Sequence, residues 1–237
     1  MAAMRTILPP GPAGALFLED LRKTLIHIGI ATILTSLASA GAAGPVLRHL
    51  KQSAAIELVA FGVPEAFLTM AQLCLTLGIL LCIPFILFRL LNLLPRLFSS
   101  VPSATIVGAW AVSTLLFYLG VVFCLKITLP YGIEFLLGFQ TEHLRPLVSA
   151  RKFVSFCTVF VFGFGLIFQL PLMMVLAGRL ISLDVKKLSR HRRYAVVMIT
   201  LLSAVLTPTP DILNQMLMGV PLYLLFEIGL MGMRWFK

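Results

Sequence analysis

The chain has 237 residues, of which 59% are hydrophobic and only 12% are charged. Soluble globular proteins carry about 25% charged residues, so this composition, with a mean hydropathy of +1.02, excludes a soluble enzyme and indicates an integral membrane protein. The net charge of +10 does not indicate nucleic-acid binding, because the basic residues lie in short segments between apolar runs and follow membrane topology.

The first distinctive segment is FLEDLRKTL at 17–25, where two of the nine acidic residues stand side by side just before an apolar run. On a helix Glu19 faces Arg22 at i+3 and Lys23 at i+4, which predicts an ordinary surface ion pair. Asp20 meets only Lys23, at i+3, and its carboxylate is therefore freer to bind another group. A carboxylate at the membrane surface can bind a guanidinium through two charge-assisted hydrogen bonds, a geometry that lysine reproduces poorly.

Apolar runs that follow predict an all-α fold with six transmembrane helices in one membrane domain, 1–237. A hydrocarbon layer about 30 Å thick requires about 20 helical residues. After a cytoplasmic segment, 1–23, the predicted spans are approximately 24–45, 66–88, 103–128, 153–177, 194–208 and 212–233. We expect the last two to be short, because Thr207 and Pro208 come early after one run and Pro221 interrupts the other.

The first span has an alternative interpretation. Arg22 and Lys23, the apolar run 26–37 and the small residues ASAGAAG resemble a secretory signal with cleavage after Ala40. We favour a span, because the basic residues follow an unusually long leader and cleavage would remove the first helix.

The distribution of Lys and Arg predicts that both termini are cytoplasmic. With the amino terminus inside, thirteen of the 19 basic residues lie on the cytoplasmic side and six lie outside. The outer connections, 46–65 and 129–152, mix apolar residues with a few charges, which is typical of interfacial helices. We therefore expect a cap on the outer face.

Polar residues inside or beside spans are candidates for function, because they are costly in a membrane. Gln169 lies near the centre of the fourth span, where it either hydrogen-bonds within the bundle or faces a partner's polar group. Glu227 lies about two turns before the inner end of the last span. The set with an expected structural or partner-binding role comprises Gln169, Asp211, which is a candidate helix N-cap, Gln215 and Glu227.

Catalytic and metal-binding patterns are absent from the sequence. His27 is the only histidine within a span, and Asp211 lies in a turn, so neither a serine nor an aspartyl intramembrane protease is indicated. The cysteines lie in apolar runs without CxxC spacing, which predicts free thiols and no metal or cofactor; they are Cys74, Cys82, Cys124 and Cys157.

Ordered short motifs give the chain a resemblance to a known family. FLEDLR at 17–22 resembles the HLxELR signature of TatC, the core receptor subunit of the twin-arginine protein translocase. Further segments resemble the family in the same order: PEAF at 64–67, Pro84, FYLG at 117–120, Phe123, Pro130, FGFGLIFQLP at 162–171, RRY at 192–194, LTPTPD at 206–211, NQ at 214–215 and PLYLLFEIG at 221–229. Together they cover nearly the whole chain.

The resemblance implies a receptor and assembly platform for the export of folded proteins, driven by the proton-motive force. It implies a multi-pass protein of a bacterial or archaeal plasma membrane that binds twin-arginine signal peptides through residues Glu19, Asp20, Leu21 and Arg22, with Asp20 at the acidic position of the motif. It also implies TatA-like and TatB-like single-span partners, which pack on the later helices and on the polar position of the fourth span, here Gln169, and self-association within the receptor complex.

The chain departs from the family pattern at several positions. Val101 stands where the family usually has a second arginine-binding Glu, Phe17 replaces the motif's His, and Gln169 occupies a site that many members fill with Glu. Two other functions therefore stay open: a membrane scaffold that binds no signal peptide, and a small-solute transporter, which requires polar residues converging at mid-membrane.

Overall fold

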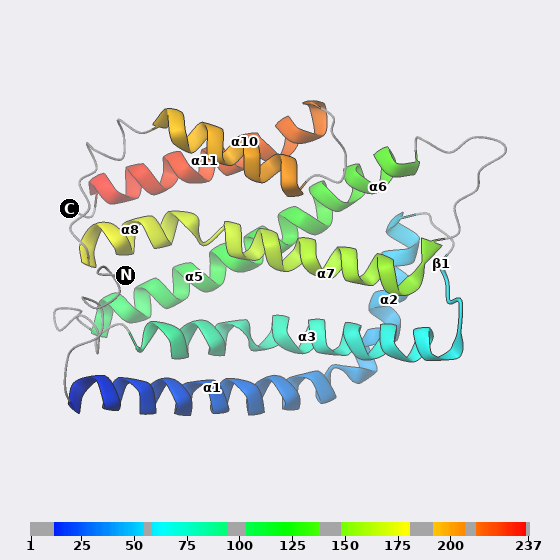
Figure 1. The fold of residues 1–237 in the computed structure, drawn as a ribbon, viewed down its shortest axis with the longest axis horizontal. Coiled ribbons are helices and arrows are strands. Elements are labelled where there is room, and N and C mark those ends of the chain that lie inside the picture. The colour runs from blue at the N-terminus through cyan, green and yellow to red at the C-terminus, as the bar shows by residue number, and fades with distance from the viewer. Residues whose placement is uncertain are drawn as a thin grey trace. The chain divides into compact units, whose positions relative to one another are not determined.

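The computed structural model describes residues 12–54, 58–93, 103–137, 148–180, 192–206 and 212–235. These residues are almost entirely helical, in agreement with the predicted fold class (Figure 1). In chain order the elements are α1 (Pro12–Ala38), α2 (Ala40–Ala54), β1 (Leu58–Val59), α3 (Val63–Leu91), α5 (Ser103–Phe123), the π-helix η2 (Cys124–Thr128), α6 (Leu129–Leu137), β2 (Val148–Ser149), α7 (Ala150–Ile167), α8 (Leu170–Leu180), α10 (Arg192–Leu206) and α11 (Ile212–Trp235).

Four helical stretches in the described part of the chain are long and apolar enough to cross a membrane. They are Glu19–Ala38, Pro64–Leu91, Thr105–Ile133 and Ala150–Arg179. Their outer surfaces carry many exposed large apolar side chains, as expected where lipid replaces water. The fold is therefore that of a multi-span helical membrane protein.

The last two helices differ in length. Helix α10 has 15 residues, about 22 Å at 1.5 Å per residue, and is short relative to a hydrocarbon layer of about 30 Å. Helix α11 has 24 residues, about 36 Å, so the expectation of a short final helix is wrong in its length. Pro221 lies inside α11 and does not end it, because packing against a neighbouring helix can hold a proline-containing helix together.

Prolines explain two irregularities of the helices. The fourth predicted span, 153–177, is divided at Phe168 and Gln169, just before Pro171, which has no N–H to continue the ladder of α7. In the third span, Pro130 follows η2, whose wide turn is closed by a hydrogen bond from the Leu129 N–H to the Cys124 carbonyl. Helical structure consequently continues past the predicted span end at 128 through α6.

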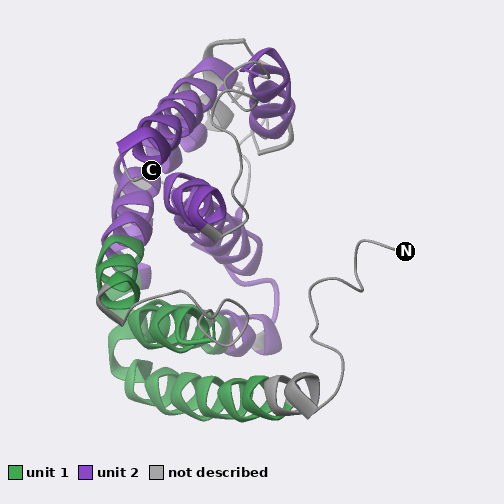
Figure 2. Cartoon of the chain, turned by 90° about the vertical axis from the view of Figure 1, so that its left-hand side faces the viewer, with its two compact units in different colours: residues 1–46, 70–114 green, residues 47–69, 115–237 purple. Residues whose placement is uncertain are grey.

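The chain forms two compact units, 1–46 with 70–114 and 47–69 with 115–237 (Figure 2). In the first unit, α1 lies against α3 (Figure 1). The Thr35 hydroxyl donates to the Gly78 carbonyl, and the Ser39 hydroxyl donates to the Cys74 carbonyl, both at 2.9 Å. A Cβ on Gly78 would lie 2.1 Å from the Ser36 Oγ, so the absent side chain is what permits this close approach.

Trp110 joins α5 to α3 within the first unit. Its indole Nε1–H donates to the Pro84 carbonyl at 2.8 Å, and its ring meets Phe88 edge-on with ring centroids 5.9 Å apart. The indole N–H thus has a hydrogen-bond partner in the backbone of α3.

In the second unit, glycines on α5 and α7 permit close approach of the opposite helix. A Cβ on Gly120 would lie 2.7 Å from the Phe164 carbonyl, and one on Gly165 would lie 2.6 Å from the Phe117 ring. Phe117 and Phe164 are each 1% exposed. These rings and glycines form the tightest contact between the two helices.

Helices α8 and α11 pack together in the second unit (Figure 1). Gly229 on α11 admits Met174, and Gly232 admits Val175. The buried side chains of this contact are Phe226, Leu230 and Met233. This packing runs along the half of α11 that follows Pro221.

A small polar structure ties two connections of the second unit. Strands β1 and β2 pair in parallel, Leu58 with Val148 and Val59 with Ser149. Beside them the Glu65 carboxylate accepts from the Phe61 N–H at 2.7 Å and from the Ser149 hydroxyl at 2.5 Å. Ser149 also caps α7 by accepting from the Lys152 N–H at 3.2 Å.

Candidate functional site

The first candidate site lies on α1 at 19–22. Because α1 begins at Pro12, Glu19 and Asp20 lie well inside a regular helix, where adjacent side chains point about 100° apart. Glu19 Oε1 lies 2.8 Å from Lys23 Nζ, and both side chains are more than half exposed. The predicted ion pair at i, i+4 is confirmed.

The other members of this site differ in exposure. Asp20 and Leu21 are half-buried and Arg22 is exposed. Asp20 takes part in an interaction of its own, whereas Lys23 is paired with Glu19. The side chains of Asp20 and Glu19 thus point in different directions, so on this helix the two carboxylates do not bind one ligand together.

Gln169 lies in the turn between α7 and α8. It is 9% exposed, and its backbone N–H donates to the Leu166 carbonyl while its own carbonyl accepts from the Met173 N–H. Gln169 also has a further interaction. Gln169 is therefore a buried polar residue at a helix break, and its predicted depth in the membrane stays a prediction.

Gln215 joins α11 to α10. Its Nε2 donates to the Thr200 carbonyl at 3.1 Å, and the fully buried Ser203 donates to the same carbonyl at 2.9 Å. The Thr200 carbonyl therefore accepts two side-chain hydrogen bonds, one from α10 and one from α11. The predicted residues Asp211 and Val101 lie outside the described residues.

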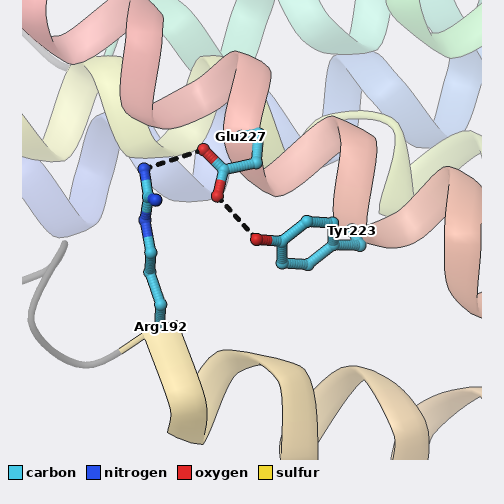
Figure 3. Close-up of polar contacts among 3 residues, drawn as sticks. All are labelled: Arg192, Tyr223 and Glu227. Atoms are coloured by element: carbon cyan, nitrogen blue, oxygen red, sulfur yellow. Dashed lines mark hydrogen bonds and ion pairs between the residues drawn. The ribbon is translucent and has the colours of Figure 1, made fainter.

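Glu227 on α11 is the centre of a polar cluster, shown in Figure 3. Its Oε2 lies 3.0 Å from Arg192 Nη2, and its Oε1 accepts from the Tyr223 hydroxyl at 2.8 Å. The side chains of Arg192 and Glu227 are 43% and 21% exposed. One carboxylate thus links the first turn of α10 to α11.

The sequence did not reveal the long-range partners of the Glu227 and Glu65 carboxylates. Arg192 and Glu227 are 35 positions apart, and Ser149 and Glu65 are 84 apart. Among the side-chain partners of the two carboxylates, only Tyr223 could have been predicted from helical spacing, because it lies four residues before Glu227. In the described residues no group of three or more His, Cys, Asp or Glu could hold a metal ion.

Comparison with known proteins decides the family. The family model described as Sec-independent protein translocase protein (TatC) matches residues 16–221. The chain belongs to the TatC family. It is therefore a component of a protein-transport translocase and a multi-pass membrane protein with transmembrane helices, and not a classical enzyme.

Individual relatives agree with this assignment. The TatC protein of Carboxydothermus hydrogenoformans is 30% identical over 93% of this chain and 92% of its own length. The TatCy protein of Bacillus subtilis is 26% identical over 90% of this chain and 85% of its own length. Both are described as Sec-independent protein translocase proteins.

A solved structure extends the agreement to three dimensions. A crystal structure of the twin-arginine translocase receptor TatC is similar with a TM-score of 0.77 at 28% identity, covering 91% of this chain and 98% of that chain. The similarity thus extends to the fold over most of both chains.

Proposed function

We propose that this TatC-family protein binds twin-arginine signal peptides of folded cargo at the amino-terminal helix and recruits partner subunits for transport. The observation that carries the proposal is the coincidence of the family match over 16–221 with an acidic residue, Asp20, at the motif position on α1. The similar protein of known crystal structure is a twin-arginine translocase receptor, which supports a receptor role for this chain.

The chemistry of the proposed contact is a guanidinium bound to the Asp20 carboxylate. Asp20 is half-buried, so a guanidinium bound to its carboxylate makes its hydrogen bonds in partial shelter from water. A charge-assisted hydrogen bond contributes about 1.5–3 kcal/mol, and the flat guanidinium can form two at once. An ammonium is a compact point charge without this fork, which supports selection of arginine over lysine.

Glu19 has a different proposed role from Asp20. It is already paired with Lys23 on an exposed surface, where such pairs contribute about 0–1 kcal/mol. Arg22 is exposed one turn after Glu19 and Leu21 is half-buried beside it. These residues complete the proposed signal-peptide surface, while Asp20 supplies its central charge.

The proposed setting is the plasma membrane of a bacterium or archaeon. The chain crosses it six times, with both termini in the cytoplasm and the connections between α1 and α3 and between α5 and α7 forming an outer cap. TatA-like and TatB-like single-span proteins are the proposed partners, together with further copies of this chain. Gln169, Gln215 and Glu227 support the later helices to which such partners bind.

The direct test is photo-crosslinking between the full chain in membranes and a signal peptide carrying a photoreactive residue beside its paired arginines. We expect Asp20→Ala to reduce the crosslinked fraction about tenfold, because it removes the charge-assisted pair. The matched control, Glu19→Ala, removes an acid one position away and should change the yield by less than about twofold. Equal effects of the two substitutions would reject the proposed site.

A membrane scaffold that binds no signal peptide is the second candidate function. Val101, at the position where the family usually has a second acidic residue, favours it. Under this alternative the chain still co-purifies with single-span partners, whereas signal peptides with paired arginines and paired lysines crosslink equally poorly.

A further inference from the structure

Four cations gather where α2 ends and α7 begins. Arg48 and Lys51 on α2 and Arg151 and Lys152 on α7 are all exposed. The pairing of β1 with β2 brings these two helix ends into one region, because β1 follows α2 closely and β2 directly precedes α7. All four residues belong to the second compact unit.

The protein itself offers little negative charge to this group. Arg151 and Lys152 occupy the first turn of α7, where the helix dipole disfavours cations. Glu65 is the carboxylate described nearby. It already accepts from Ser149 and Phe61, and it also interacts with the backbone N–H and the charge of Arg151. In the described ranges none of the four cations forms a salt bridge within 4.0 Å, and one carboxylate near Arg151 leaves most of the positive charge of the group uncompensated there.

The surface beside these cations is apolar. Phe61 and Phe67, which flank the start of α3, are 66% and 72% exposed. On α2, Leu47 and Leu50 are half-buried at i, i+3, while Arg48 and Lys51 are exposed at the same spacing. Apolar residues next to a cationic helix face are typical of a segment at the level of lipid headgroups, where the anionic groups are phosphates.

We propose that this end of the protein binds the phosphates of anionic phospholipids, such as phosphatidylglycerol, through Arg48, Lys51, Arg151 and Lys152. A basic residue near an anionic membrane surface gains about 1 kcal/mol, which corresponds to about fivefold in local lipid enrichment per cation. A lipid phosphate also adds negative charge near the first turn of α7, where Glu65 is the carboxylate described nearby. The proposal concerns a lipid site and does not depend on signal-peptide binding.

The test measures local lipid composition in bilayers with one added tryptophan as the reporter. Full-length protein with Phe61→Trp is reconstituted into bilayers that contain either brominated phosphatidylglycerol or brominated phosphatidylcholine, and quenching of its extra emission over the two native tryptophans is compared. We expect the binding ratio of phosphatidylglycerol to phosphatidylcholine to be about five or more at low salt. Replacing all four cations, R48Q/K51Q/R151Q/K152Q, should lower it to about one.

The controls separate this site from general charge effects and from misfolding. Arg179→Gln with Arg234→Gln removes two exposed cations of the same unit and should leave the ratio unchanged. If the fourfold variant does not fold, salt replaces it: raising ionic strength from about 0.01 M to 1 M shortens the Debye length from about 30 Å to 3 Å, which should reduce the ratio at least twofold. A ratio near one at low salt, or a ratio indifferent to salt, overturns the proposal, whatever the signal-peptide crosslinking shows.

Discussion

Glu227 and Glu19 are both paired with a cation, yet their surroundings give the two ion pairs different contributions to the stability of the protein. Glu227 is one-fifth exposed and receives hydrogen bonds from Arg192 and Tyr223, whereas Glu19 and Lys23 are both more than half exposed. Removing one partner from a shielded pair leaves an uncompensated charge that water solvates poorly. An exposed pair loses little, because water solvates both groups.

We therefore predict that Glu227→Ala destabilises the protein by about 2 kcal/mol, a value reduced from that of a fully buried pair because Arg192 is partly exposed. Tyr223→Phe should cost about 1 kcal/mol, since it removes one hydrogen bond. Thermal unfolding of purified protein in a mild detergent measures both. Glu19→Ala is the control, with an expected loss below about 0.5 kcal/mol; an equal loss for Glu19→Ala and Glu227→Ala would contradict this ranking.

The same two residues show which contacts the sequence can predict. The pair of Glu19 with Lys23 follows from helical spacing alone and is confirmed. The pair of Glu227 with Arg192 depends on how α11 returns along α10, and nothing in the spacing of 35 residues specifies that return. Local geometry predicts local pairs, whereas long-range pairs require the tertiary fold.

Among the helices, the contact between α1 and α3 depends on one missing side chain. A Cβ at Gly78 would meet the Ser36 Oγ at 2.1 Å and the Ser36 Cα at 2.5 Å, and a backbone atom cannot rotate away. The hydroxyl bonds from Thr35 and Ser39 to α3 require the same close approach. Separation of the two helices would therefore break several contacts together.

We predict that Gly78→Ala destabilises the protein by about 1–3 kcal/mol, as expected for a group forced into a packed contact. Gly108→Ala is the matched control, because a Cβ on Gly108 meets nothing within 4 Å and alanine has the higher helix propensity. The melting temperature in detergent should fall for Gly78→Ala and stay unchanged or rise for Gly108→Ala. A fall of equal size in both variants would mean that the contact does not limit stability.

Prolines show why helix ends were harder to predict than helices. Pro171 coincides with a break, whereas Pro84 and Pro221 lie inside continuous helices. The Trp110 indole bonds the Pro84 carbonyl, and the part of α11 beyond Pro221 packs on α8. These are tertiary contacts, so proline alone could not decide where α11 or the fourth span would be interrupted.

At the scale of the whole molecule, composition and motif order were sufficient for the fold class and the family. Low charge predicted a helical membrane protein, and the ordered segments from FLEDLR to PLYLLFEIG predicted the family that the match over 16–221 establishes. The two-strand pairing of β1 with β2 was not predicted, because strands of two residues carry no periodic signal. The six-span topology stays a prediction.

That topology predicts the location of each connection. Alkaline phosphatase, which is active only after export, should be active when fused within 138–147 and inactive when fused within 181–191 or after residue 237. The reason is the excess of Lys and Arg in the segments assigned to the cytoplasm. The opposite pattern of activities would contradict the predicted orientation. Asp20 would then lie on the side of the membrane that an incoming signal peptide does not reach.

The most direct test of the central proposal is export of a folded reporter in cells that lack their own TatC and express this chain with its single-span partners. We predict export when the signal peptide carries paired arginines, and loss of export when both arginines become lysines or when the chain carries Asp20→Ala. Equal export with paired arginines and paired lysines, or export unaffected by Asp20→Ala, would contradict recognition of the arginine pair at Asp20.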